Sequence, residues 1–237
     1  LSSAASDVYK RQAFMKGIIF DFNGTMIFDE KFHNIAWRKF LENQIGRSVS
    51  DNEFQKYVHG RNAEATLSYF LQRNLKIEEV MMLEEEKEVI YRSLCLKSSD
   101  FKLADGLSEF LNELLNAGVP FTIATASGLK NMEFFFEQLN LSKWFEFDKV
   151  VYNDGTLPGK PEPDLFLKAA DKIGKDIKKC VIFEDAGSGI EAAKRAGANM
   201  IIGVESMLNR DTLLSIGADK TIRNYCELGK FINENIV

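Results

Sequence analysis

Apolar, β-branched runs alternate with amphipathic helices from about residue 100 onward, and this alternation constrains the fold more than any other feature. The first helix is marked by apolar residues at helical spacing before Gly118, which are Leu107, Phe110, Leu111, Leu114 and Leu115. Strands are then expected at 119–125, 147–152, 180–185 and 199–204, and helices at 129–139, 164–173 and 188–196. Such alternation predicts an α/β fold, with a Rossmann-like parallel sheet covered by helices on both faces.

Residues 29–98 differ from this pattern. They contain no proline and only two of the sixteen glycines, and their apolar residues recur at helical spacing. The motif Ser50-x-x-Glu53 is a capping box, and the helix that follows it is expected to end near Gly60. The run 16–22 (KGIIFDF) just before them predicts a buried strand. We therefore expect an α/β core, residues 15–28 plus 99–237, interrupted by an all-helical domain at 29–98.

The first fourteen residues, LSSAASDVYKRQAF, show no periodicity and no apolar segment typical of a signal peptide. The hexapeptide DVYKRQ resembles the translated read of a transposase sequencing adapter. Our hypothesis is that 1–14 are a non-native leader and that Met15 is the true start; a natural disordered leader is the alternative. Coding sequence upstream of Met15 in the native transcript would contradict the hypothesis.

Composition excludes several functional classes. A formal net charge of −5 disfavours nucleic acid or an anionic membrane as the main partner, and no apolar run approaches the roughly 18 residues of a membrane span. The three cysteines (Cys95, Cys180 and Cys226) lie far apart and form no Cys-x-x-Cys motif. A reducing, cytoplasmic compartment fits this cysteine usage best, and a monomer is expected.

The chemistry-bearing residues follow the predicted strands. Ligands of an open parallel sheet bind beyond the carboxyl ends of its strands. The residues at these positions are Asp21 and Asn23 after the first strand, Thr125-Ala126-Ser127 after the second, Lys160 in a proline-rich loop, and Glu184-Asp185 after the fourth. Each alone has a simpler interpretation as a turn, a helix cap or a solvated loop residue. Together they supply oxygen ligands for Mg²⁺, donors for phosphate oxygens and a cation for developing charge.

In this order the motifs resemble those of the haloacid dehalogenase superfamily. They are DFNGT (21–25), Thr125, Lys160 in GKPEPD, and FEDAGSGIEAAKRAG (183–197). The helical insertion is similar to the small cap of the β-phosphoglucomutase and sugar-phosphatase branch. The resemblance covers essentially all of 15–237 and is specific for the superfamily, but it says less about the substrate.

The resemblance implies a role for each residue. Asp21 would be the nucleophile that takes the phosphoryl group as an aspartyl phosphate. Mg²⁺ would be held by the carboxylates of Asp21 and Asp185 and the main-chain carbonyl of Asn23, with Glu184 nearby. Phosphoryl oxygens would be bound by Thr125 and the N–H of Ala126, and Lys160 would pair with both the phosphoryl group and Asp21.

Asn23 departs from the family pattern, which has a general acid/base Asp at this position. An amide exchanges no proton near neutral pH, and losing such help typically costs about 10²- to 10⁴-fold in rate. Three explanations compete: a substrate with a good leaving group such as an acyl phosphate, a substitute acid of which His33 is the best candidate, and deamidation of Asn23-Gly24 to aspartate. For His33, a hinge or capping contact is the simpler interpretation.

The expected function is Mg²⁺-dependent hydrolysis of a small phosphorylated metabolite, with a sugar phosphate as the leading candidate. Arg61, in the His59-Gly60-Arg61-Asn62 turn between two cap helices, would bind a second group of the substrate; a solvated Arg61 beside a helix-ending glycine is the alternative. A β-phosphoglucomutase-like phosphomutase is the close rival. The other hypothesis is a weakly active protein that binds a phosphorylated ligand, because an Asn at position 23 would remove turnover while the metal and phosphate contacts remain.

Overall fold

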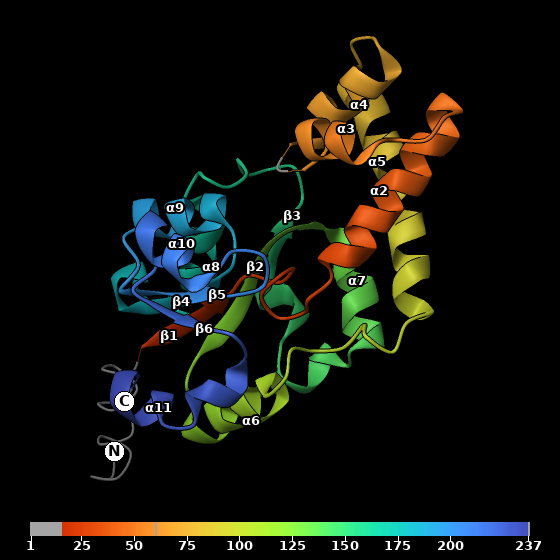
Figure 1. Ribbon diagram of the computed structural model, residues 1–237. Coiled ribbons are helices and arrows are strands. Elements are labelled where there is room, and N and C mark those ends of the chain that lie inside the picture. Colours follow the sequence, from red (N-terminus) through yellow and green to blue (C-terminus); the bar gives the residue numbers. More distant parts are fainter. Residues whose placement is uncertain (1–15, 60, 237) are drawn as a thin grey trace, which may run out of the picture. The chain divides into compact units, whose positions relative to one another are not determined.

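The computed structural model describes residues 16–59 and 61–236 (Figure 1). The chain forms two compact units, the core unit (residues up to Phe28 and from Lys102 on) and the helical unit (Asp29–Phe101). For comparison, the sequence predicts the second boundary after residue 98. The hypothesised leader, residues 1–14, and Met15 lie outside the described residues.

The core unit is built on a six-stranded parallel sheet, which confirms the predicted α/β fold. Its strands are β1 (Gly17–Phe20), β2 (Phe121–Gly128), β3 (Val151–Asn153), β4 (Cys180–Glu184), β5 (Met200–Val204) and β6 (Lys220–Ile222). The strand order is β3-β2-β1-β4-β5-β6. The chain runs outward through β2 and β3 and then resumes on the other side of β1, so β1 and β4 form the switch point at which ligands bind in such sheets.

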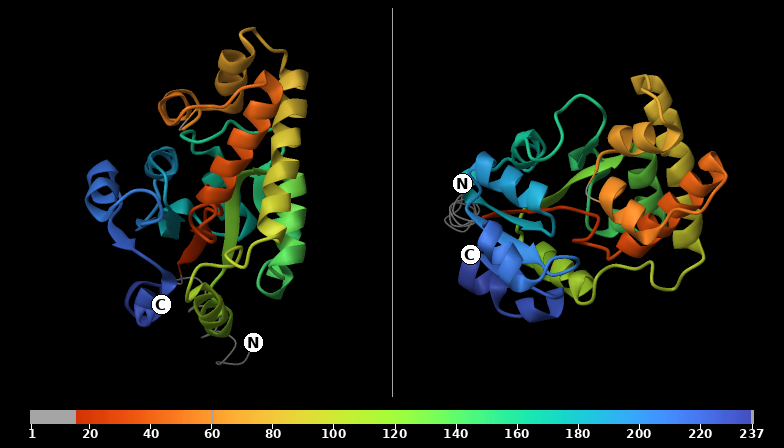
Figure 2. Two further views of the ribbon diagram at one scale, coloured as in Figure 1. Left: turned by 45° about the vertical axis from the view of Figure 1, so that its right-hand side comes forward. Right: turned by 45° about the horizontal axis from the view of Figure 1, so that its top comes forward.

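Helices cover both faces of this sheet (Figure 2). Those of the core unit are α6 (Leu107–Ala117), α7 (Leu129–Gln138), α8 (Asp164–Lys172), α9 (Gly187–Ala196), α10 (Arg210–Ile216) and α11 (Phe231–Asn235), with short 3₁₀ turns η1 (Leu141–Lys143), η2 (Phe147–Lys149), η3 (Ile177–Lys179) and η4 (Tyr225–Leu228). The strand predicted over 147–152 is wrong in its first half: η2 forms there, and β3 begins only at Val151.

The two faces of the sheet have different cores because neighbouring side chains of a strand point to opposite faces. Ile19 of β1 lies in an aliphatic cluster with residues of α8 and α9, among them Phe166 and Ile190. Phe20, the next residue, stacks on Phe183 of β4 with ring centroids 5.0 Å apart, within an aromatic cluster on the other face. Packing on both sides holds the ends of β1 and β4 in a fixed position.

The helical unit has its own core, which includes Leu41, Leu67 and Phe70. Its helices are α2 (Glu30–Ile45), α3 (Asp51–Tyr57), α4 (Ala63–Leu71) and α5 (Ile77–Leu96). The predicted capping box forms at the start of α3, where the Ser50 side chain accepts a hydrogen bond from the Glu53 N–H at 3.2 Å. That helix ends at Tyr57, whereas Gly60, the predicted end, lies outside the described residues. None of the described helices is long and apolar enough to cross a lipid bilayer.

Candidate active site

Three carboxylates meet where β1 and β4 end. Because Phe20 pairs with Phe183 in the parallel register, the residues that follow the two strands are neighbours. The Asp21 N–H donates to the Phe183 carbonyl at 2.9 Å, which extends the sheet bonding by one residue. Asp21, Glu184 and Asp185 are all buried, and each offers an oxygen within 4.8 Å of those of the other two. So dense a group of buried acids requires positive charge nearby.

Lys160 supplies part of that charge. Its side chain is buried, and its Nζ donates to Asp21 Oδ1 at 2.5 Å and to Glu184 Oε1 at 2.7 Å. One lysine against three carboxylates leaves a formal excess of negative charge if all are ionised. A cation with oxygen ligands would neutralise it, and carboxylate oxygens without nitrogen or sulfur favour Mg²⁺ over a softer metal.

Two glycines are required beside these carboxylates. A Cβ built on Gly189, in the first turn of α9, would lie 1.6 Å from Glu184 Oε1. A Cβ on Gly24 would lie 2.1 Å from Asp185 Oδ2, and Gly24 also has a φ of +76°, which side-chain-bearing residues rarely adopt. The glycine-rich turns after β1 and β4 therefore make room for the acidic groups.

Hydroxyl groups from two loops hold Asp185. Thr25 Oγ1 donates to Asp185 Oδ1 at 3.1 Å, and Ser206 Oγ donates to Asp185 Oδ2 at 3.0 Å. The sequence analysis did not identify Ser206 as a site residue. The signal that could have identified Ser206 is its position just after β5, because the other site residues were identified by their positions at strand ends.

The pKa values of the cluster follow from its burial. Burial raises the pKa of Asp21 well above its usual range; Lys160 opposes this shift, and the Glu184 and Asp185 carboxylates add to it. Burial, with Glu184 adding, raises the pKa of Asp185 to about 7. For Lys160 burial lowers the pKa, but the attraction of Asp21 and Glu184 outweighs it, so the pKa lies above its usual value.

The raised pKa of Asp185 makes the stability of the metal-free protein depend on pH. Between the unfolded value, about 3.9, and the folded value, about 7, the folded chain binds more protons, so the free energy of unfolding falls as pH rises. We expect a lower unfolding midpoint in EDTA at about pH 8 than at about pH 5.5, and a smaller difference in Asp185→Asn. Calorimetry checks this, and a midpoint that rises over that window in the wild-type protein would contradict it.

The predicted phosphate-binding residues lie within β2, in its carboxyl-terminal half, and not after the strand as predicted, because β2 continues to Gly128. Thr125 is buried, and its Oγ1 accepts from the Ser127 N–H at 3.1 Å; Ala126 is exposed. Ser127 Oγ donates to Asn23 Oδ1 at 2.7 Å, which connects this strand end to the turn after β1. The structure thus places Asp21, Asn23, Thr125, Lys160 and the Glu184-Asp185 pair on one edge of the sheet.

The other two predicted residues belong to the helical unit. Arg61 is exposed between α3 and α4. His33 lies on α2 with Nε2 3.2 Å from Asp29 Oδ2 and Nδ1 3.2 Å from Lys87 Nζ, and its ring stacks on Tyr91 at 3.9 Å. Asp29 and Lys87 are both buried. The contacts of His33 are those of a residue that joins α2 to α5 within this unit.

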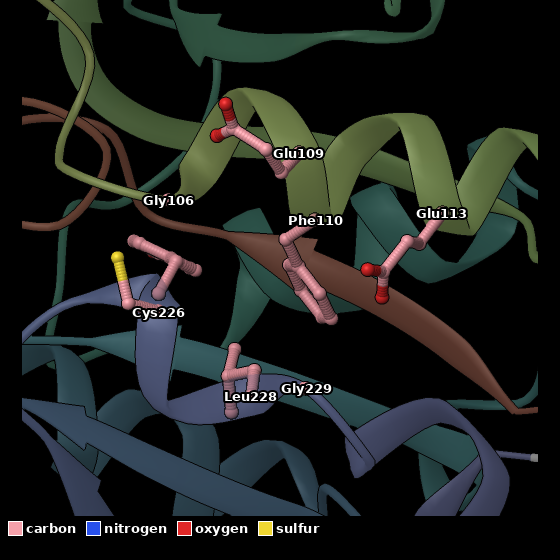
Figure 3. A pocket seen from close by; sticks show the side chains of 8 residues that line it. Gly106, Glu109, Phe110, Glu113, Cys226, Leu228 and Gly229 are labelled. Carbon is pink, nitrogen blue, oxygen red and sulfur yellow. The ribbon is translucent and has the colours of Figure 1, made fainter.

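Tyr225 connects the site to a separate pocket. The buried Tyr225 hydroxyl donates to the Thr25 carbonyl at 3.2 Å, and Thr25 in turn binds Asp185. The same tyrosine lines a pocket of about 290 Å³ between α6 and η4, into which Phe110 points (Figure 3). None of the catalytic, metal-binding or phosphate-binding residues predicted from the sequence lines that pocket, so the cluster at the ends of β1 and β4 is the candidate site.

Comparisons with known proteins identify the family to which this chain belongs. Residues 15–197 match the family model described as haloacid dehalogenase-like hydrolase. The fructose-1-phosphate phosphatase YqaB of Escherichia coli is 30% identical over 197 residues, which cover 82% of this chain and 97% of that protein. The β-phosphoglucomutase of Bacillus subtilis is 28% identical over 216 residues, which cover 88% and 92% of the two proteins.

A solved structure is also similar. It is the crystal structure of a HAD hydrolase, family IA, variant 3, from Entamoeba histolytica, with a TM-score of 0.86 and 38% sequence identity. The match covers 90% of this chain and 95% of that one, so both the parallel sheet and the helical insertion fall within it.

Proposed function

This chain belongs to the haloacid dehalogenase-like hydrolases, whose members similar to it include phosphatases and a phosphomutase, and on that premise we propose that it is an Mg²⁺-dependent phosphatase of a small phosphorylated metabolite. The observation that carries the proposal is the buried cluster of Asp21, Glu184, Asp185 and Lys160 at the switch point of the sheet. Phosphorylated carbohydrates are the first substrates to test, because relatives along most of the chain are named for them.

Asp21 is the proposed nucleophile. Lys160 lies 2.5 Å from Asp21 Oδ1, so its positive charge would lower the repulsion between this carboxylate and an incoming phosphate. Thr125 and the Ala126 N–H, at the end of the neighbouring β2, would bind the phosphoryl oxygens. Attack by Asp21 on phosphorus would give an aspartyl phosphate and release the leaving group.

Mg²⁺ fits the donor set of this site. Asp21, Asp185 and the main-chain carbonyl of Asn23 would hold the ion, with Glu184 beside it; Glu184 Oε2 accepts from the Ala186 N–H at 2.6 Å, which orients that carboxylate. When bound, Mg²⁺ would offset the charge of the phosphate and of the surrounding acids. The chain's own contribution is the fixed placement of the oxygens, through Gly24, Thr25 and Ser206.

A phosphomutase is the second candidate. Its support is the similarity to the β-phosphoglucomutase of Bacillus subtilis along 88% of this chain. Such an enzyme would use Asp21 in the same way and return the phosphoryl group to a sugar hydroxyl. Product analysis separates the two functions, since only a phosphatase releases inorganic phosphate in proportion to the substrate consumed.

The experiment is a measurement of phosphate release from a panel of phosphorylated sugars, sugar acids and acyl phosphates, with Mg²⁺ and with EDTA. We expect turnover that is lost in EDTA and restored by Mg²⁺, because Lys160 alone does not offset the charge of three crowded carboxylates, which would repel a phosphate. Phosphate release that continues undiminished in EDTA would contradict the metal dependence.

Ser206→Ala tests the support of the metal ligand Asp185. Removing the 3.0 Å hydrogen bond to Asp185 Oδ2 should weaken Mg²⁺ binding by about 10- to 100-fold, the usual effect of losing a group that orients a metal ligand. Ser215→Ala is the matched control, because Ser215 Oγ donates only to the Thr212 carbonyl on α10. Titration calorimetry with Mg²⁺ measures both variants, and equal affinities would contradict the assignment.

A further inference from the structure

We infer that the preferred substrate of this site is an acyl phosphate, a mixed anhydride of phosphoric acid and a small carboxylic acid. The inference rests on the proposed function and narrows its substrate class. It follows from the three explanations for Asn23, of which the structure disfavours two.

The first explanation, deamidation of Asn23, meets a rigid turn. Forming the succinimide requires the Gly24 nitrogen to attack Cγ of Asn23. The Gly24 N–H donates to the Ile27 carbonyl at 2.8 Å, and Gly24 is fixed at a φ of +76° against Asp185. Ser127 holds Asn23 Oδ1 at 2.7 Å. Attack would require the Gly24 N–H to leave the Ile27 carbonyl, so this hydrogen bond disfavours deamidation in the folded chain.

The second explanation, a substitute acid, finds its best candidate engaged. An ammonium group has only donors, so Nδ1 of His33 must accept from Lys87, and the ring proton then lies on Nε2, facing Asp29. Both ring nitrogens of His33 are therefore engaged by residues of the helical unit. His59 is the other histidine of the chain and also belongs to the helical unit, so the core unit has none.

The third explanation needs no proton donor. Asp21 attacks phosphorus and forms a new P–O bond, while the P–O bond to the substrate breaks and its electron pair leaves as a carboxylate. A carboxylate is the conjugate base of an acid of pKa about 4, so it departs without a proton, whereas an alkoxide needs one. Water then attacks phosphorus and forms a new P–O bond, while the P–O bond to Asp21 breaks and its electron pair returns to the Asp21 carboxylate. Both protons of the water leave on the product as dihydrogen phosphate, which exchanges protons with solvent near neutral pH.

The test compares two substrates in three full-length proteins. Phosphate release with Mg²⁺ is measured for acetyl phosphate and fructose 1-phosphate in wild type, Asn23→Asp and Asp21→Asn; the Asp21→Asn rate is subtracted as the uncatalysed background. We expect wild type to act on acetyl phosphate and only slowly on the sugar ester. Asn23→Asp should raise the sugar-ester rate by about 10²- to 10⁴-fold, the contribution of a general acid, and raise the acetyl phosphate rate far less.

A shape-matched pair controls for binding. Phenyl phosphate and 4-nitrophenyl phosphate are similar in shape but differ in the acidity of the leaving phenol, so the gain in rate from Asn23→Asp should be larger for phenyl phosphate.

Equal gains on both, or wild-type turnover of fructose 1-phosphate as fast as that of acetyl phosphate, would overturn the inference and leave the phosphatase function standing. So would a His59→Gln or His33→Gln variant that selectively loses sugar-ester hydrolysis. If no protein releases phosphate in an Asp21-dependent manner, the proposed function itself fails.

Discussion

Asp21→Asn is expected to abolish phosphate release, with a loss on the order of 10⁴-fold or more, the scale on which enzymes lose rate without their nucleophile. Asp21 directly follows β1, at the edge where the ligand-binding switch point lies, and its Oδ1 contacts Lys160. An amide of nearly the same shape keeps the packing but cannot form the aspartyl phosphate. The measurement is phosphate release with the best substrate of the panel.

Asp171→Asn is the matched control. It makes the same chemical change at an exposed residue near the end of α8, outside the cluster. Circular dichroism should show that both variants are folded. Wild-type activity in Asp21→Asn would contradict the assignment of the nucleophile.

Gly189→Ala is expected to be strongly destabilising, whereas Gly187→Ala is expected to be tolerated. At position 189 the added methyl group would lie 1.6 Å from Glu184 Oε1, whereas at position 187 the side chain that it would meet is Ile216, with Cδ1 at 3.7 Å. At 189 the Glu184 carboxylate must move away from Lys160, and breaking a buried ion pair on one side costs roughly 3–5 kcal/mol.

Urea unfolding of both variants makes this comparison. The Gly187→Ala protein should be unchanged or more stable by up to about 1 kcal/mol, since alanine favours a helix over glycine. Gly189→Ala should also lose phosphatase activity, because Lys160 and Glu184 no longer hold each other. Equal stabilities of the two variants would show that Glu184 can rearrange at little cost.

Local patterns were sufficient for much of the fold. The helical stripe before Gly118 forms α6 with Gly118 as its C-cap, and α8 and α9 form where helices are predicted, over 164–173 and 188–196. These signals act within one element, through backbone conformation and side-chain spacing, so a single sequence contains them. The strand predicted over 147–152 was wrong in its first half because η2 and β3 have only three residues each, and periodicity does not separate elements this short.

The rule that site residues lie at the carboxyl ends of parallel strands correctly predicted that Asp21, Lys160 and Glu184 are neighbours, because these strands end at one edge of the sheet. The same rule missed Ser206, which follows β5 but has no neighbouring motif to mark it. Tyr225 could not be found in this way. It lies 200 positions from Thr25 in the chain, and only the folding of the whole core unit brings η4, and with it the Tyr225 hydroxyl, to the Thr25 carbonyl.

Trapping the phosphoryl group on Asp21 is the decisive test of its role as the nucleophile. The protein is mixed with Mg²⁺ and acetyl phosphate, quenched in acid during turnover, digested and analysed by mass spectrometry. We predict one phosphoryl group on the peptide that contains Asp21, in wild type and in Asn23→Asp. Steady turnover with the phosphoryl group on another residue, or with the same adduct in Asp21→Asn, would contradict the account.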